Sequence, residues 1–341
     1  MAIQSNLRIK FFHNAGMTKQ RLLIYAIIIV LALPFSSLAE NHSNAFTTWL
    51  DQLRLEAISG GISSQTWELA FAGIHTPNPK IISFDRNQPE AIQTLDAYLS
   101  AQINARRIRI GQQMIQRYPT WLDRVEKKYN VQKRFLVALW GIETGYGENQ
   151  GAFPVIHSLA TLAFDGRRAD YFRKELIDAL RLLDDGIISH KRMTGSWAGA
   201  MGNFQFMPSS YRRYALDEDQ SGSINLWRSV PDSLGSAAHY LATAGWKNDQ
   251  TWGREVRLPV DFDLSLAGLE TRLPLSRWQS LGVRRSNGQP LPTRDIKASL
   301  IMPDGPGGRT FLVYDNFRVI MSWNQSQLFA LAVGVLSDHF N

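Results

Sequence analysis

An apolar run that ends in a single glutamate is the feature that most constrains the fold of this chain. The segment reads Phe135-Leu-Val-Ala-Leu-Trp-Gly-Ile-Glu143 and is followed at once by Thr-Gly-Tyr-Gly147. With helical spacing, Leu136 and Leu139 lie seven and four residues before Glu143 and share its face. Gly145 suits the left-handed position that closes a helix. The run therefore predicts a helix with an apolar face that ends in a loop directly after Glu143.

On this reasoning Glu143 is a candidate acid catalyst. A carboxyl group against an apolar wall keeps its proton readily, because its charged form loses hydration. A carboxylic acid that is still protonated near neutral pH is what cleavage of a glycosidic bond requires. The alternative is that Glu143 is a surface or ion-paired residue, as a lone glutamate at a helix end usually is.

The first 39 residues have the pattern of a secretory signal peptide. Lys19 and Arg21 precede the apolar stretch Leu22–Leu33, and Ser37-Leu38-Ala39 offers small residues where a signal peptidase would cut. Met17 would open a signal of more usual length than Met1 does. The predicted location of the protein is therefore the periplasm, with membrane attachment only if the signal stays uncleaved.

Charge and cysteine content narrow the function classes. Four of the 37 basic residues lie before Glu40, so 33 remain against 30 acidic residues. A mildly basic exported protein suits an anionic polymer such as the cell wall, and nucleic acid is not an expected partner. The chain has no cysteine. Disulfides, thiol chemistry and a lipidated N-terminal cysteine are therefore excluded.

Helical spacing of apolar residues dominates the chain up to about residue 252. We expect helices at Phe46–Ile58, after the capping stretch Ser63–Thr66, along Ala91–Tyr118, and at Trp121–Tyr129, Tyr171–Leu183 and Ser233–Ala244. Alternating apolar and polar residues in Val256–Leu264, with short runs at 300–303 and 310–314, predict strands instead. The expected organisation is a helical region 40–252, a small β-containing subdomain 253–318, and a C-terminal segment 319–341 whose helix packs on the helical core.

The segment Gly195–Tyr211 is rich in Gly, Ala and Ser, and Pro208 should begin a helix near its end. Such a loop lets a bulky ligand approach the backbone, while Ser196, Asn203 and Gln205 offer hydrogen bonds. A tightly packed junction between a helix and a loop would have the same composition. The residues alone leave both interpretations open.

Four motifs in order carry a resemblance to a known family. They are Glu143-Thr-Gly-Tyr-Gly, Asp165-Gly-Arg-Arg-Ala-Asp-Tyr-Phe172, the segment Gly195–Tyr211, and Ile224-Asn-Leu-Trp227, with Trp323-Asn-Gln-Ser326 near the end. Over about residues 45–338 the chain resembles the membrane-bound lytic murein transglycosylase B family, glycoside hydrolase family 103.

The resemblance implies a mainly α (α+β) fold, with a lysozyme-like helical catalytic core, an extra α-helical region and a small β-containing subdomain. It also implies an activity. Enzymes of this kind cleave the β-1,4 bond between N-acetylmuramic acid and N-acetylglucosamine in peptidoglycan without water, and leave 1,6-anhydromuramoyl ends.

The resemblance also assigns roles to individual residues. The single catalytic acid/base is Glu143. The implied substrate-binding residues are Ser196, Gln205, Arg167, Arg168, Tyr98 and Tyr240, joined by Asn203 from the glycine-rich segment. Structural alternatives remain: local ion pairs with Asp165 and Asp170 for the arginines, and core positions with a satisfied hydroxyl for the tyrosines.

A second catalytic carboxylate, which ordinary glycosidases use, has no obvious candidate. Asp165 follows Glu143 at a lysozyme-like interval, but its Phe-Asp-Gly-Arg-Arg turn favours a role toward the backbone. We therefore expect Glu143 to protonate the leaving oxygen and then to take the proton of the attacking C6 hydroxyl. The substrate's N-acetyl carbonyl, or an oxocarbenium held by the cleft, would stand in for the missing nucleophile.

Two rival functions are open. In a hydrolytic muramidase, water would attack in place of the C6 hydroxyl. A catalytically idle scaffold would bind peptidoglycan without cleaving it, but the joint presence of Glu143, Ser196 and Gln205 argues against this. The expected partners are peptidoglycan glycan strands and proteins of cell-wall synthesis or remodelling.

Residues 217–228 are spaced like an EF-hand calcium loop. Position twelve, which should supply a carboxylate, is Arg228. We expect it to reach back to Asp217 or Asp219 and to replace the ion by a salt bridge. No cofactor is therefore required, and tight calcium binding is not expected. The candidate ligands of the loop are Asp217, Asp219, Ser221, Ser223 and Asn225.

Overall fold

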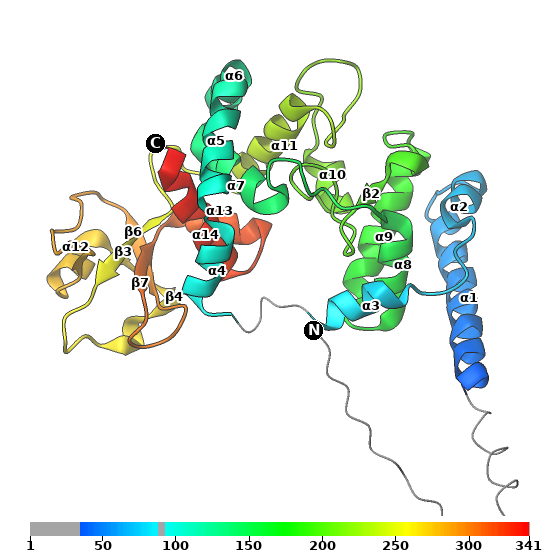
Figure 1. Cartoon of the computed structure of the whole chain (residues 1–341), viewed down its shortest axis with the longest axis horizontal. Coiled ribbons are helices and arrows are strands. Elements are labelled where there is room, and N and C mark those ends of the chain that lie inside the picture. The colour runs from blue at the N-terminus through cyan, green and yellow to red at the C-terminus, as the bar shows by residue number, and fades with distance from the viewer. Residues whose placement is uncertain (1–34, 88–92, 341) are drawn as a thin grey trace, which may run out of the picture.

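The computed structural model describes residues 35–87 and 93–340, and it is mainly helical with a small sheet (Figure 1). Helices α1 (Phe35–Ser59) and α2 (Ser64–Phe71) lie at one end of the molecule, and a five-stranded sheet lies at the other. The predicted fold class is confirmed. Of the expected signal peptide, residues 1–34 lie outside the described residues.

Helix α7 (Lys133–Thr144) lies in the middle of the fold because its sequence is apolar on every side. Residues 135–140 are all at most 3% exposed, and Gly141 is buried. The helices that contact α7 are α5 (Ala105–Arg117), α6 (Pro119–Tyr129), α11 (Val230–Thr243) and α14 (Gln327–Ser337). Four neighbours fix the axis of α7, and with it the position of its last residues.

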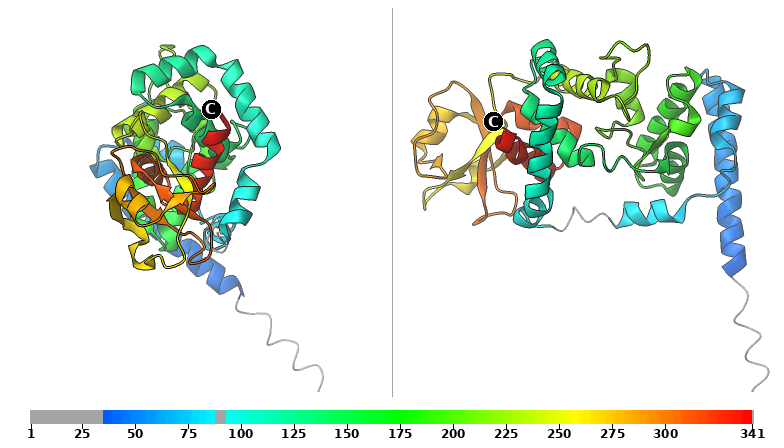
Figure 2. Two further views of the ribbon diagram at one scale, coloured as in Figure 1. Left: turned by 90° about the vertical axis from the view of Figure 1, so that its left-hand side faces the viewer. Right: turned by 45° about the horizontal axis from the view of Figure 1, so that its top comes forward.

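A second group of helices packs around α8 (Val155–Asp165) and α9 (Ala169–Asp184), which contact each other along their length. Their neighbours are α2, α3 (Pro79–Arg86) and α10 (Pro208–Tyr214). Figure 2 shows this group between α1 and the central helices. Two short strands, β1 (Phe153–Pro154) and β2 (Thr194–Gly195), pair beside α8.

The larger sheet is antiparallel, with strand order β4-β6-β7-β3-β5. Its strands are β3 (Gly253–Arg257), β4 (Gly268–Pro274), β5 (Arg284–Arg285), β6 (Lys297–Ile301) and β7 (Thr310–Val313). With α12 (Leu275–Ser280) they enclose a separate apolar core that includes Val256, Trp278 and Leu312. Helices α13 (Asp315–Trp323) and α14 then return the chain to the helical body, although the proposed domain boundaries themselves stay a prediction.

Two predicted elements differ from the structure. Residues 91 and 92 of the helix expected at Ala91–Tyr118 lie outside the described residues. The rest is two helices, α4 (Leu95–Gln102) and α5, because the Asn104 side chain accepts a hydrogen bond from the Arg107 N–H (2.9 Å) and starts a new helix. The strand expected through Leu264 stops at Arg257. Pro259 follows, which has no N–H for a sheet ladder.

Among the described residues, no single helix is long and apolar enough to cross a membrane. One sharply bent pair, Asp315–Trp323 with Gln327–Phe340, meets the length and composition criteria only when the two are taken together.

Candidate active site

Glu143 lies half-buried in the last turn of α7, where the predicted apolar face puts it. Leu136 and Leu139 on the same face are buried. Gly145 ends the helix with a φ of 60° and donates its N–H to the Gly141 carbonyl (3.0 Å). The predicted helix end is therefore confirmed. The side chain stands where the chain leaves the helix for a loop.

The indole of Trp323 fixes the Glu143 carboxylate. Its Nε1–H donates to Glu143 Oε1 at 2.7 Å. The Trp323 ring packs 4.6 Å from that of Tyr240 and 5.1 Å from that of Phe206. The Tyr240 hydroxyl in turn donates to the Ser322 carbonyl (2.6 Å). A packed aromatic group thus orients the carboxylate through the indole N–H of Trp323.

Tyr240 thus belongs to the aromatic group that packs on Trp323, the partner of Glu143. Tyr98 lies on α4, where it is 4% exposed within the main apolar core. Of the two interpretations of Tyr98, the geometry favours a core residue. Tyr240 remains a candidate for the sugar-binding surface.

The glycines of the segment Gly195–Tyr211 are needed for packing. A Cβ on Gly195 would lie 2.1 Å from the Ala200 carbonyl oxygen. A Cβ on Gly202, whose φ is +69°, would lie 2.6 Å from the Leu226 carbonyl oxygen. The tightly packed junction thus explains the composition without a ligand. Whether sugars also approach this backbone remains a proposal.

Two of the three polar candidates in this segment remain suited to a ligand. Gln205 has a φ of 50°, and its Nε2 donates to the carbonyls of Gln150 (3.2 Å) and Gly202 (3.0 Å). Within the described chain no protein donor reaches Gln205 Oε1, so this oxygen is oriented and can accept from a hydroxyl. The Ser196 hydroxyl accepts from the Ala200 N–H (3.1 Å) and keeps its own proton for a partner.

Asn203 is a structural residue. It is 3% exposed, and its Oδ1 accepts from Trp140 Nε1 (3.1 Å) and Gln150 Nε2 (3.0 Å). Its Nδ2 donates to the Leu226 carbonyl and to the Ser233 hydroxyl, both at 3.1 Å. Both ends of the amide are used inside the protein. We therefore assign Asn203 to the support of the loop rather than to substrate contact.

Arg167 and Arg168 both bind Asp85, at 2.6 and 2.7 Å, rather than Asp165 or Asp170. Asp85 is 1% exposed, and the hydrogen bond from Arg167 holds its pKa below the ordinary value despite burial. Asp165 instead pairs with Arg86 (2.9 Å). The two guanidinium groups are about half exposed, so each keeps N–H donors toward solvent.

Tyr171 on α9 is an exposed aromatic residue to which sequence reasoning gave no role. Burial raises the pKa of Tyr171 to about 12. Tyr171 lies three residues after Arg168, the residue that precedes α9, and it is 45% exposed. An exposed aromatic ring of this kind suits the apolar face of a sugar.

The EF-hand-like loop 217–228 is held in part by Asp232, a residue outside the twelve positions of the EF-hand pattern. Oxygen atoms of Asp217, Asp219 and Asp232 lie within 4.8 Å of one another. Asp232, on α11, accepts from the N–H groups of Glu218 (2.9 Å) and Asn225 (2.9 Å), and burial raises its pKa. Sequence reasoning missed it because it lies beyond position twelve.

The predicted salt bridge of Arg228 does not form. Across the described ranges no ion pair joins it to Asp217 or Asp219. Arg228 sits after a turn in which Asn225 Oδ1 accepts from the N–H groups of Trp227 (3.3 Å) and Arg228 (3.2 Å). Ser221 donates to the Ser223 carbonyl (3.2 Å). Three clustered carboxylates without a basic partner are a set that fits a hard cation such as calcium.

Comparisons with known proteins show similarity over most of the chain. The family model described as transglycosylase SLT domain matches residues 45–338. Membrane-bound lytic murein transglycosylase B of Escherichia coli (strain K12) is 35% identical over 227 residues, which cover 65% of this chain and 60% of that protein. The match thus spans about three fifths of the length of that relative.

Two solved structures match this chain over a larger share of their own length than the Escherichia coli relative does. SltB3 from Pseudomonas aeruginosa, in complex with NAG-NAM-pentapeptide, is 44% identical with a TM-score of 0.83, covering 86% of this chain and 79% of that one. Slt35 from Escherichia coli, in complex with calcium, is 28% identical with a TM-score of 0.72, covering 86% of this chain and 92% of that one.

Proposed function

Because the chain belongs to the transglycosylase SLT domain family, we propose that it is a lytic transglycosylase of peptidoglycan. It cleaves the β-1,4 bond between N-acetylmuramic acid and N-acetylglucosamine and closes a 1,6-anhydro ring on the muramic acid. The observation that carries the proposal is the half-buried Glu143 carboxyl, held at 2.7 Å by a neutral indole donor. Names of similar proteins, which include lytic murein transglycosylase and a NAG-NAM-pentapeptide complex, support the same substrate.

In the mechanism that we propose, Glu143 acts alone. Its proton passes to the glycosidic oxygen as the bond from C1 of the muramic acid to that oxygen breaks. The ionised Glu143 then takes the proton of the C6 hydroxyl, whose oxygen bonds to C1, so the acid is regenerated. Attack within one bound sugar has a large effective concentration. The pairing of Asp165 with Arg86 supports a single-acid mechanism, since it gives that carboxylate another partner.

The substrate is proposed to lie along Tyr240, Tyr171 and Gln205. The tyrosine rings offer faces for sugars, and Gln205 Oε1 accepts from a sugar hydroxyl. Outward N–H groups of Arg167 and Arg168 would meet substrate carboxylates. The same proposal puts the enzyme in the periplasm. N-terminal sequencing of the protein recovered from the cell envelope tests this, because a cleaved signal peptide would leave Glu40 as the first residue.

Release of soluble fragments from purified sacculi tests the proposed activity. An active transglycosylase lowers the turbidity of the suspension and releases muropeptides. An idle peptidoglycan-binding scaffold would sediment with the sacculi and release nothing. Binding without release would therefore overturn the proposal.

Removing the indole donor with Trp323→Phe is expected to lower kcat about 10- to 100-fold, because a hydrogen bond to a charged group contributes about 1.5–3 kcal/mol. Phenylalanine retains most of the packing against Tyr240. The pH dependence of kcat should also move, which a purely structural change would not cause. Trp246→Phe is the matched control, since its Nε1 donates to Gln132 at the other end of α7 (2.6 Å). Equal losses in both variants would contradict an orienting role.

We further propose that Asp217, Asp219 and Asp232 bind calcium and that the ion stabilises the loop without taking part in the chemistry. Calcium at about millimolar concentration should raise Tm by a few degrees, as expected for a weak extracellular site. Asp219→Asn should remove this rise, since the amide keeps the oxygen that accepts from Ser221 but loses the charge. A Tm that does not change with calcium, or a rise in Tm that persists in Asp219→Asn, would refute the site.

A further inference from the structure

A hollow of about 310 Å³ beside the glycine-rich segment has only positive charges around it. Its charged residues are Lys191, Arg192 and Arg228, which lie with Gln150, Thr194 and Trp227. In the part of the chain that the structure describes, none of the three basic side chains has an acidic partner within ion-pair distance. We call this site the cationic hollow.

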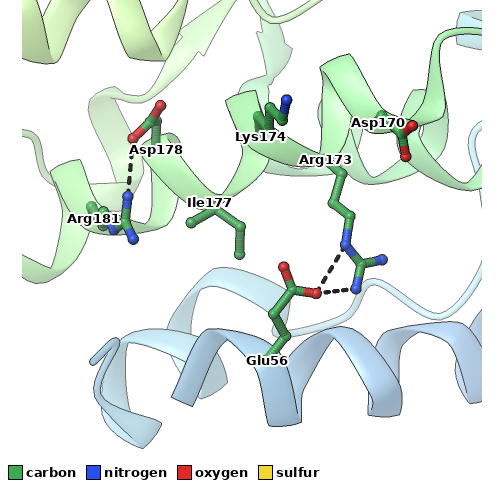
Figure 3. A pocket seen from close by; sticks show the side chains of 7 residues that line it. All are labelled: Glu56, Asp170, Arg173, Lys174, Ile177, Asp178 and Arg181. Atoms are coloured by element: carbon green, nitrogen blue, oxygen red, sulfur yellow. Dashed lines mark hydrogen bonds and ion pairs between the residues drawn. The ribbon is translucent and has the colours of Figure 1, made fainter. Parts of the chain in front are cut away.

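A larger hollow, of about 540 Å³ between α1 and α9, shows the contrast (Figure 3). Its acidic and basic residues neutralise each other: Arg173 pairs with Glu56, and Arg181 contacts Asp178 (3.5 Å). The cationic hollow has no such internal partners. Like charges around one concavity repel each other and focus a positive potential into it, which favours an anionic ligand.

The floor of the cationic hollow is rigid. Trp227 Nε1 donates to the Thr194 carbonyl (3.0 Å), and Gln150 Nε2 donates to the Trp227 carbonyl (2.9 Å). The Gln150 carbonyl accepts from Gln205 (3.2 Å), a proposed sugar-binding residue. The hollow and the glycine-rich segment therefore share one hydrogen-bonded frame.

This position also accounts for Arg228, which the EF-hand pattern does not explain. Its N–H is held by Asn225 Oδ1 (3.2 Å), and its side chain lines the hollow instead of pairing with the carboxylates of the loop. Arg228 thus lines the cationic hollow, whereas Asp217 and Asp219 belong to the carboxylate cluster.

We propose that the cationic hollow binds carboxylates of the peptide stems of peptidoglycan, an inference that rests on the proposed function. A stem ends in a carboxylate, and a guanidinium group binds a carboxylate through two parallel N–H donors. A stem of five residues reaches up to about 17 Å from its sugar. The carboxylate comes either from the strand that is cut or from a neighbouring strand.

The test compares strands with and without stems. Glycan strands are prepared with intact peptides, and a matched portion is stripped of them with an amidase. The variant carries Lys191→Gln, Arg192→Gln and Arg228→Gln together. Its KM is expected to rise about eightfold on strands with stems, from three charge contacts of about twofold each, and to stay within about twofold on stripped strands.

The control variant carries Arg109→Gln, Lys127→Gln and Lys297→Gln, which removes the same charge at exposed positions elsewhere. It should show no difference between the two substrates. If the KM of the triple variant rises on isolated strands with stems, the bound stem belongs to the strand that is cut. If the KM rises only on intact sacculi, the bound stem belongs to a neighbouring strand. An equal rise on stripped strands, or no rise on any substrate, would overturn the inference.

A direct measurement keeps the two proposals separable. Calorimetric titration with a free stem pentapeptide should give binding by the wild type and the control variant, and binding about eightfold weaker by the triple variant. If the wild type cleaves no substrate, the proposed function fails; if it cleaves but binds no peptide, only the cationic hollow fails.

Discussion

Replacing Glu143 by glutamine is expected to lower turnover of peptidoglycan by at least about a thousandfold, since general acid–base catalysis contributes about 10²- to 10⁴-fold and here one group performs both steps. An amide can neither donate the proton to the leaving oxygen nor accept that of the C6 hydroxyl. Its oxygen can still accept from Trp323, so the fold and the binding of glycan should persist. Muropeptide release from sacculi measures the loss, and sedimentation with sacculi measures the binding.

Glu148→Gln is the control for this experiment. Glu148 lies five residues further on, exposed, and pairs with Arg106 at the surface (2.9 Å). Its replacement should leave the rate within about twofold, because exposed ion pairs contribute little. A Glu143→Gln enzyme with a rate near that of the wild type would remove Glu143 from the mechanism.

A large effect on stability is expected from Gly202→Ala. The new Cβ would lie 2.6 Å from the Leu226 carbonyl oxygen, at a φ of +69° that alanine adopts at a cost. Left-handed strain costs about 1–2 kcal/mol and overpacking typically costs about 1–3 kcal/mol. The free energy of unfolding should therefore fall by about 2–5 kcal/mol. Urea denaturation measures it.

Gly186→Ala separates the two contributions. Gly186 has nearly the same φ, +66°, but nothing lies within 4 Å of its Cβ position. Only the strain remains, so the loss should be about 1–2 kcal/mol. Equal decreases in the free energy of unfolding at both positions would show that the contact with Leu226 adds no cost at Gly202. Activity is also expected to fall with Gly202→Ala, because Asn203, which supports the loop, donates its N–H to the same Leu226 carbonyl (2.8 Å).

Local patterns predict the helix that carries Glu143 well. Apolar spacing and Gly145 define where α7 ends, and both act within one or two turns. The break at Asn104 was missed because its cap competes with a helical pattern that continues on both sides. Sequence patterns within a few residues cannot distinguish one long helix from two short helices when tertiary packing determines which of them forms.

The surroundings of Glu143 could not be predicted, because they come from distant parts of the chain. Trp323 lies 180 residues away, and a tryptophan in a motif does not show where its N–H points. Asp85, which binds both arginines, lies in α3, for which no helix was predicted. Similarly, Asp232 reaches the loop from α11, outside the spacing that the EF-hand pattern examines.

Mass spectrometry of the products released from purified sacculi tests the central claim most directly. If the C6 hydroxyl attacks C1 under the control of Glu143, each new muramic acid end carries an anhydro ring and is lighter by one water than a hydrolytic product. The account predicts only these lighter ends, with no label taken up from ¹⁸O-water. Ends with a full reducing sugar, labelled by the solvent, would contradict it and identify a hydrolase.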